Sequence, residues 1–397
     1  MIYLFCFLSC ILIDNLKQRK LTIYHLLIAI VGIILCFGYT CGSDWRHYEL
    51  MYEDPRELDH YRSREFGFVL YFECLHTFIS DFWITNAISK IFFLYALASF
   101  FKIFTKNNWT CIGVSFAFKT LFLVIDCPMR YMMAIAILLL GMKSFLRKKF
   151  YKYGLFAIIA TCFQNTIIIV AILNILLLYS DKLFKINRFW MITITIVFFI
   201  ISRFDLLYLK MFNILGNILK ISEGGDNRIL FYAFFNLNGS IVSIENIWHL
   251  GLLLLIIWNK QIIAQSPYGK ITVIGSWLYI ILGYLLNPIP TGFRLSILLG
   301  FFFVLSIEAL IRKGLKVWKK NYSLISTSIV VWLMIIIGKD AYSIPAYYPY
   351  TNSIPYIITG HLPYEYRSNY NYKEYEKNIR KLPEQSTNNV NNNLLNQ

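Results

Sequence analysis

The sequence predicts an all-α, polytopic integral membrane protein, because apolar residues dominate it and return in regular stretches. Of 397 residues, 57% are hydrophobic and only 15% are charged. The apolar stretches are about 15–23 residues long, close to what a helix rising 1.5 Å per residue needs to cross about 30 Å of hydrocarbon. Helices also satisfy their own backbone hydrogen bonds in lipid. Because no long polar stretch remains for a soluble domain, we expect one membrane domain over residues 1–340.

The apolar stretches give the expected spans in order. They lie near 1–13, 21–39, 82–104, 109–125, 131–146, 153–179, 188–203, 241–258, 271–286, 292–311 and 324–338. The stretch 153–179 is long for one crossing, and two short helical legs that turn near Gln164 and Asn165 fit it better. With this hairpin, about 11–12 transmembrane helices are expected. Residues 67–80 then form an amphipathic or re-entrant helix on the outer side.

Basic residues set the predicted orientation, because Lys and Arg in short loops favour the cytoplasmic side. The basic clusters placed there are 17–20, 102 and 106, 143–152, 182–188, 260 and 270, and 312–320. Residues 1–13 lack a basic n-region and a small-residue cleavage site, so they predict a retained first span with its N-terminus outside.

This orientation gathers polar loops on the outer face. The loops hold residues that are far apart in the sequence: 44–65, 126–130, 164, 224–228 and 287–294. Positive charge in short outward loops opposes the usual bias, so Arg130 and Arg294, each at the mouth of a span, need a local reason. An anionic ligand would supply one.

Composition and motifs exclude several classes of function. The net charge of +16 lies mostly in the predicted cytoplasmic loops, where orientation and anionic lipid account for it. Basic residues dispersed among spans argue against nucleic acid as a partner. The 8 cysteines form no C-x-x-C motif and the 6 histidines form no H-x-x-x-H motif, so no metal ion is expected. Cys41 and Cys127 both lie near the outer face and could form a disulfide. Glycine-rich phosphate motifs are also missing, so no nucleotide and no other cofactor is expected.

Several short motifs follow one another on the predicted outer face. They are Gly42-Ser43-Asp44 with Tyr48, Glu65 with Gly67 and Phe68, Arg130 with Ala134, Arg228 with Tyr232, and Arg294. In this order they resemble the EpsG/Wzy-type bacterial polysaccharide polymerases, over roughly residues 1–350. Such proteins transfer a glycan chain from a polyprenyl diphosphate carrier to the next lipid-linked repeat unit at the outer face of the cytoplasmic membrane.

The resemblance implies a GT-C-like membrane glycosyltransferase architecture and a role for each motif residue. Departure of a polyprenyl diphosphate builds negative charge, which the planar guanidinium groups of Arg130, Arg228 and Arg294 would bind without a metal ion. The acceptor hydroxyl must lose a proton, which Asp44, or in second place Glu65, would accept. Gln164 stands where the family often has a histidine, so it can hydrogen-bond to sugars but cannot act as a base. The expected glycan contacts are Tyr48, Gln164 and Tyr232.

Each candidate also has a structural explanation that needs no ligand. Arg130 and Arg294 could simply snorkel, or they could pair with Asp126 and Glu308. Arg228 could be a solvated loop charge with Asp226 beside it, and Glu65 could pair with Arg62 or Arg64. Asp44 could instead cap the helix that begins near Trp45, since Asp is a favoured N-cap residue. Glu308 also lies four residues before Arg312, a spacing that favours an ion pair within one helix.

The C-terminal part differs in composition from the rest. Residues 341–375 are rich in Tyr and Pro and are expected to lie partly ordered on the outer side, followed by a disordered polar tail to 397. The function expected is polymerisation of lipid-linked repeat units for a capsule, an exopolysaccharide or an O-antigen in the bacterial inner membrane. The alternative is a flippase or transporter of lipid-linked glycans. Expected partners are the polyprenyl diphosphate-linked oligosaccharide, membrane lipid and a chain-length regulator protein.

Overall fold

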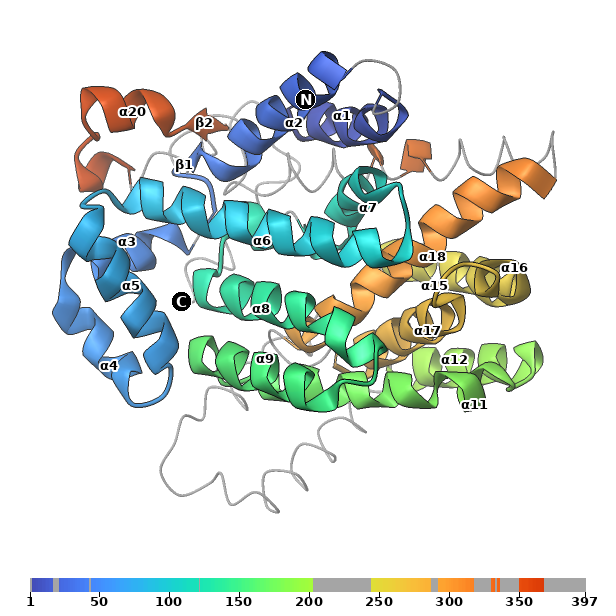
Figure 1. Ribbon diagram of the computed structural model, residues 1–397. Coiled ribbons are helices and arrows are strands. Elements are labelled where there is room, and N and C mark those ends of the chain that lie inside the picture. The colour runs from blue at the N-terminus through green and yellow to red at the C-terminus, as the bar shows by residue number, and fades with distance from the viewer. Residues whose placement is uncertain are drawn as a thin grey trace, which may run out of the picture.

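A layer of roughly parallel helices forms the centre of the molecule. The computed structural model describes residues 2–16, 21–42, 44–120, 122–202, 244–286, 292–317, 330–332, 334–335 and 350–367. Figure 1 shows α6 (Phe82–Phe104), α8 (Met129–Leu146) and α9 (Phe150–Phe163) side by side in this layer. α8 packs against both neighbours. Because α6 and α8 begin at the same end of the layer, their first turns are brought together there.

The other described helices surround this layer. Their bounds are α1 Ile2–Leu16, α2 Leu21–Cys36, α3 Trp45–Glu53, α4 Asp59–Arg62, α5 Phe66–Phe78, α7 Asn108–Ser115, α10 Ile167–Leu173, α11 Ser180–Phe184, α12 Arg188–Ile201, α15 Ile244–Trp258, α16 Lys260–Ala264, α17 Gly269–Leu286, α18 Phe293–Val317 and α20 Ile354–Thr359. α17 packs against α18, and α1 packs against α2 and α7. Among the described residues, all regular structure except one pair of two-residue strands is helical, as the composition predicts.

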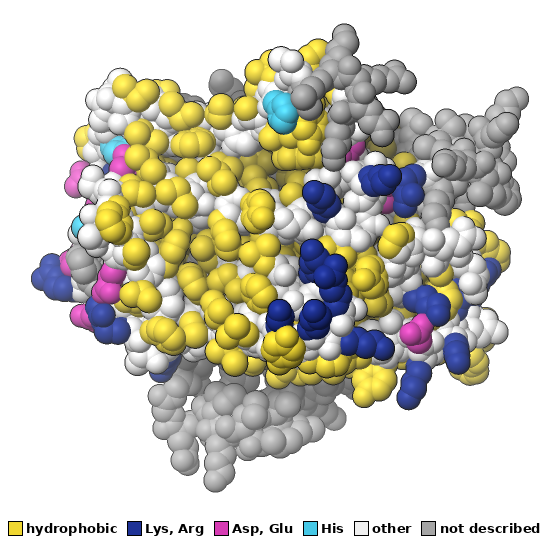
Figure 2. Space-filling view, viewed as in Figure 1, with side chains coloured by type: hydrophobic (Ala, Val, Ile, Leu, Met, Phe, Trp, Pro, Cys, Tyr) yellow, Lys and Arg dark blue, Asp and Glu magenta, His cyan; other side chains and the backbone are white. Residues whose placement is uncertain are grey.

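Five described helical segments are long and apolar enough to cross a membrane, namely Phe82–Phe104, Met129–Leu146, Ile167–Phe184, Gly269–Leu286 and Arg294–Arg312. Shorter apolar helices of 10–17 residues include most of α1, α2, α5, α9, α12 and α15. Figure 2 shows hydrophobic side chains covering the face formed by α6, α8 and α9. These features fit an all-α membrane protein, while the expected 11–12 passes stay a prediction.

The ends of α6 and α8 follow from local chemistry. The Asp81 carboxylate accepts hydrogen bonds from the backbone N–H groups of Trp83 and Ile84, at 2.7 and 3.4 Å, and so caps α6. Pro128 directly precedes α8, where its missing N–H costs nothing. The last turn of α8 carries Lys143, whose charge suits a helix C-terminus.

The predicted hairpin in 153–179 is present as two helical legs. α9 ends at Phe163 and α10 begins at Ile167, so the turn falls at Gln164 to Thr166. The Tyr153 hydroxyl donates to the carbonyl of Ala171 at 3.3 Å and accepts from the Asn174 amide at 2.8 Å. These contacts join the start of the first leg to the second leg, so the chain folds back on itself.

The predicted span 109–125 has a composite structure. α7 is followed by the π-helical turns Phe116–Thr120 and Phe122–Asp126, and then by Cys127 with φ of +52°. π-helical turns occur often near functional sites, because they shift the direction of the side chains that follow. Here they lead into Arg130 at the start of α8.

The two strands join segments that are far apart in the sequence. β1 (Gly38–Tyr39) pairs antiparallel with β2 (Thr351–Asn352), with Gly38 opposite Asn352. The backbone N–H of Ser353 also donates to the carbonyl of Phe37 at 2.7 Å. Residues 350–367 therefore lie against the loop that follows α2. This loop leads into the segment 38–66, which contributes to the candidate site.

Candidate functional site

Three segments meet at the end of the layer where α6 and α8 begin (Figure 1). They are the stretch 38–66, the first turn of α8, and the turn between α9 and α10. An ion pair and a hydrogen bond of Glu65 connect all three. The sequence placed these segments on one face, and the structure brings them into contact.

The centre of this region is an ion pair between Arg130 and Glu65. Nη1 of Arg130 lies 2.5 Å from Oε2 of Glu65, and the two side chains are 21% and 7% exposed. Oε1 of Glu65 accepts the backbone N–H of Asn165 at 3.3 Å. Arg62, a local partner considered for Glu65, pairs with Asp59 and Glu73 instead. The pair therefore links α8 to the start of α5, because Glu65 directly precedes that helix.

Two tyrosines hold the guanidinium of Arg130 in place. The buried Tyr48 hydroxyl accepts a long hydrogen bond from Nε of Arg130 at 3.5 Å. The ring centroid of Tyr61 lies 4.2 Å from Cζ of Arg130, within the range of a cation–π interaction. Burial raises the pKa of Tyr48 to about 12, so its hydroxyl stays protonated at neutral pH. Tyr48, which was expected to contact the glycan, thus contacts the side chain of Arg130.

Asp44 directly precedes α3 at the N-cap position. Its side chain makes no capping hydrogen bond, so the structure does not show the capping role that the sequence suggested. The charge of Asp44 acts on Tyr48 and on His47. Burial and the charge of Arg130 lower the pKa of His47 below its usual 6.5. Asp44 and Arg130 therefore act electrostatically on the same two side chains.

Gly42 allows the loop before α3 to pack closely against Ile125 and Asp126, just before α8. Its φ is +92°, and a Cβ there would lie 2.5 Å from Cα of Asp126 and collide with the carbonyl oxygen of Ile125. Thr40 and Cys127 also have positive φ, at +53° and +52°. A β-branched residue in this region is strained, and such strain clusters at functional sites. The glycine of the Gly42-Ser43-Asp44 motif thus serves close backbone packing.

Arg294 lies beside the same end of α8. The Tyr131 hydroxyl donates to the Arg294 carbonyl, and the Tyr131 ring centroid lies 5.9 Å from Cζ of Arg294. Tyr131 directly follows Arg130, so Arg294 contacts the first turn of α8 one residue away from Arg130. Glu308, a partner considered for Arg294, instead pairs with Arg312 at 3.0 Å, as the spacing of four residues predicts.

The remaining predicted contacts are only partly placed. Gln164 follows the last residue of α9 and is half-buried in the turn whose Asn165 contacts Glu65. Arg228 and Tyr232 lie outside the described residues. Cys41 and Cys127 are free thiols, so the pairing left open by the sequence is not formed.

Sequence reasoning missed Lys90, which is buried on α6 with 1% of its surface exposed. It forms no ion pair with any residue in the described part of the chain. Its charge acts on the thiols of Cys36, Cys41 and Cys127. A charge inside a membrane helix is expensive and usually functional. A lysine in the middle of the apolar run 82–104 was the available signal.

A second network was also missed, and it involves the C-terminal segment. Arg367 forms an ion pair with Glu49, whose carboxylate also accepts from Nε1 of Trp83 at 2.9 Å. The Arg367 and Glu49 side chains are 6% and 2% exposed. Glu49 follows Tyr48 on α3, so the C-terminal segment reaches the helix that supports Arg130.

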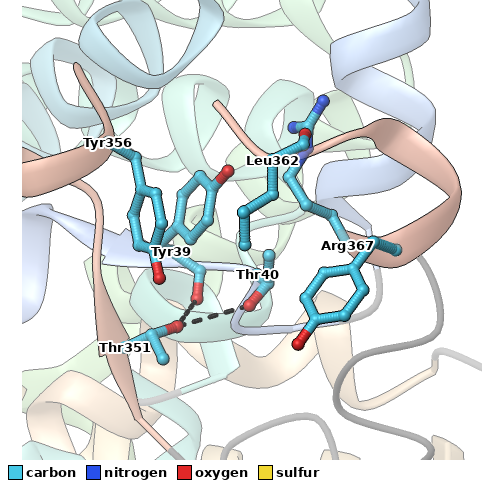
Figure 3. A pocket seen from close by; sticks show the side chains of 7 residues that line it. Tyr39, Thr40, Thr351, Tyr356, Leu362 and Arg367 are labelled. Carbon is cyan, nitrogen blue, oxygen red and sulfur yellow. Dashed lines mark hydrogen bonds between the residues drawn. The ribbon is translucent and has the colours of Figure 1, made fainter. Parts of the chain in front are cut away.

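Aromatic stacking strengthens the same contact. The rings of Tyr39 and Tyr356 stack with centroids 4.3 Å apart, and His361 lies 2.8 Å from the Asp81 carboxylate. Figure 3 shows both tyrosines with Thr351 at a small hollow, where the Thr351 hydroxyl donates to the Tyr39 carbonyl. Residues 350–367 therefore act as a brace across the loop after α2 and the start of α6.

Comparison with known proteins decides the family. A family model described as the EpsG family matches residues 21–352, which is most of the chain. The chain belongs to the EpsG family. Searches of curated proteins and of solved structures gave no match. The EpsG match supports a polysaccharide polymerase of the glycosyltransferase type and covers every predicted site residue.

The EpsG match also covers Lys90 and all of the Arg130 surroundings, but not Arg367. Among the residues the structure describes, no group of three or more His, Cys, Asp or Glu could hold a metal ion. In this EpsG-family chain, Arg130 pairs with Glu65, and Arg294 contacts Tyr131, the residue that follows Arg130.

Lys90→Met is expected to separate a functional from a structural role in the EpsG-family chain. Because a buried charge without a partner destabilises a fold, an apolar residue of similar length should leave the protein at least as stable. Polymer formation should fall by about tenfold or more if the ammonium stabilises charge at the site. The measurements are polymer yield and membrane level, with the exposed Lys106→Met as control. Normal polymer yield with Lys90→Met would exclude Lys90 from the site.

Proposed function

We propose that this chain is an oligosaccharide repeat-unit polymerase of the bacterial inner membrane with a GT-C-like architecture. It transfers a growing glycan from a polyprenyl diphosphate carrier to a lipid-linked repeat unit at the outer face. Family membership supports the polymerase class. The observation that carries the transfer chemistry is the guanidinium of Arg130, held by Glu65, Tyr48 and Tyr61 at one end of membrane-length helices.

In the proposed reaction, a hydroxyl of the acceptor sugar attacks the anomeric carbon of the donor glycan. The bond from that carbon to the carrier diphosphate breaks, and the diphosphate leaves with the electron pair. Arg130 donates to the charge that develops on its oxygens, together with Arg294 and Arg228. Such stabilisation is often the largest catalytic contribution, and it needs no metal ion. Continued polymerisation by purified protein in excess chelator is the corresponding expectation.

The hydroxyl proton goes to a carboxylate. Asp44 is the first choice, because its charge acts on Tyr48 beside Arg130. Glu65 is the second choice. Arg130 neutralises it without substrate, and a diphosphate that competes for the guanidinium would release its carboxylate. Tyr48, Gln164 and Tyr232 complete the proposed glycan contacts.

The proposal requires the Arg130 end of the molecule to face outward. Figure 2 shows Lys and Arg side chains gathered toward the opposite end of α6 and α8, which supports this orientation through the positive-inside rule. Reporter fusions should therefore place Glu53 outside and Lys149 inside. A cytoplasmic signal from Glu53 would contradict the proposed orientation.

Deletion of the gene tests the reaction itself. If the chain joins repeat units at the outer face, the deletion strain should hold single lipid-linked units that are already accessible to a membrane-impermeant glycan probe. A flippase deletion would leave these units inaccessible. If the single units are inaccessible in the deletion strain, the polymerase proposal is wrong and the flippase alternative is favoured.

Asp44→Asn tests the proton acceptor. Asn keeps the shape and the hydrogen bonds of the side chain but cannot take up a proton at neutral pH. We expect retained binding of the lipid-linked unit with loss of long chains. Normal chain length from Asp44→Asn would move the base assignment to Glu65, which Glu65→Gln then tests.

A further inference from the structure

A cavity lies far from Arg130, between the last turns of α6 and α8. Its volume is about 560 Å³. Lys102, Lys143 and Arg147 line it together with Tyr95, Ser99 and Tyr268. Lys143 lies thirteen residues after Arg130 on α8, which is about 20 Å along a helix. The cavity is therefore separate from the proposed active site.

The three cations have no acidic partner. No carboxylate in the described part of the chain forms an ion pair with Lys102, Lys143 or Arg147. Nearby Lys270, in contrast, pairs with Asp181 at 2.7 Å. Three cations around one cavity repel each other, so an anion bound among them would be favoured.

An apolar track leads along α6 into this cavity. Ile88, Ile91 and Tyr95 are 36%, 50% and 64% exposed, and they lie on one face of the helix at spacings of three and four residues. The same spacing continues to Ser99 and Lys102, which line the cavity. Figure 2 shows the hydrophobic area ending where Lys and Arg gather. Apolar surface that meets a basic cavity matches a molecule with a hydrocarbon chain and an anionic head.

We propose that this cavity binds an anionic phospholipid. The phosphate lies among Lys102, Lys143 and Arg147, and an acyl chain lies along Ile88, Ile91 and Tyr95. Basic pockets between membrane helices on the cytoplasmic side are suited to such headgroups. The Tyr268 and Ser99 hydroxyls supply neutral hydrogen-bond donors to the phosphate oxygens. A soluble anion would make no use of the exposed apolar track.

The full-length protein tests this proposal in nanodiscs. Discs contain equal amounts of phosphatidylglycerol and phosphatidylcholine, and native mass spectrometry measures which lipid stays bound. The cavity variant is Lys102→Gln with Lys143→Gln and Arg147→Gln. The control is Lys148→Gln with Lys149→Gln and Lys152→Gln, which removes the same charge from exposed residues that do not line the cavity.

Preference for phosphatidylglycerol should fall by about tenfold or more in the cavity variant and stay within about twofold in the control. An equal fall in both variants would mean general surface attraction and would overturn the proposal. Retained preference in the cavity variant would also overturn it, as would stronger binding of a polyprenyl phosphate or displacement by inorganic phosphate alone. If the triple variant does not fold, Lys102→Gln and Arg147→Gln singly should each weaken the preference several-fold.

Discussion

Replacing Arg130 by alanine is expected to lower polymer formation about 100- to 1,000-fold, as loss of a single charge-stabilising donor typically does. Glu65, Tyr48 and Tyr61 fix the guanidinium of Arg130 before any substrate binds. Arg130→Lys should restore only part of the activity, because an ammonium group lacks the planar fork that binds phosphate through two parallel hydrogen bonds. Polymer yield per membrane-inserted protein is the measurement.

A structural effect of Arg130→Ala must be distinguished from a catalytic one. The substitution leaves the Glu65 carboxylate buried without its cation, which destabilises the protein by itself. The double variant Arg130→Ala with Glu65→Gln removes that unpaired charge. If the double variant folds normally and makes no polymer, while Glu65→Gln alone still makes polymer, Arg130 acts on the substrate. Recovery of polymer in the double variant would assign Arg130 a purely structural role. Arg56→Ala, which removes an exposed arginine near the site, is the control.

Arg367→Ala is expected to destabilise the protein by about 3–5 kcal/mol, the usual cost of breaking a buried ion pair on one side. Glu49 is only 2% exposed and would keep Trp83 as a donor but lose its cation. The reduction should appear as a lower unfolding temperature of the purified protein in detergent. Because Glu49 follows Tyr48 on α3, a loss of polymer is expected as well.

The matched tests use the same pair. Glu49→Leu with Arg367→Met removes both charges and should recover most of the lost stability, because well-packed apolar residues often replace a buried ion pair without cost. The exposed Arg64→Ala serves as control for loss of one arginine. An unchanged unfolding temperature for Arg367→Ala would mean that residues 350–367 contribute little to the fold.

Much of the helical layout follows from the sequence, because lipid demands apolar stretches of a fixed length. The ranges 82–104, 131–146 and 271–286 predict α6, α8 and α17 nearly to the residue. The turn near Gln164 could be predicted because the charge bias of the following loop required the chain to return. The composite span that ends in π-helical turns could not, since hydropathy does not report the hydrogen-bond pattern within an apolar run.

The candidate site could be predicted as a set of segments but not as a set of contacts. Charge placement predicted that Glu65, Arg130 and Gln164 share one face, yet the ion-pair partners considered for Glu65 were Arg62 and Arg64. From sequence alone, residues that are close in the chain are the natural candidates for an ion pair. Tertiary packing instead brings Glu65 to Arg130, which is far away in the sequence. Lys90 was hidden because one lysine barely changes the mean hydropathy of a 23-residue helix.

The brace formed by residues 350–367 has a consequence for the order in which the protein is built. Glu49 and Arg367 are 318 residues apart, which is the largest sequence separation among the ion pairs of the described residues. At about 5–20 residues per second, a ribosome finishes that interval roughly 15–65 s after Glu49 emerges. Until then Glu49 lacks its partner Arg367, so we expect the helix that supports Arg130 to be fully stabilised only after nearly every span has been inserted. If the chain is the proposed polymerase, we expect its activity to begin late in biogenesis, so that partly synthesised chains in the membrane leave lipid-linked units unused.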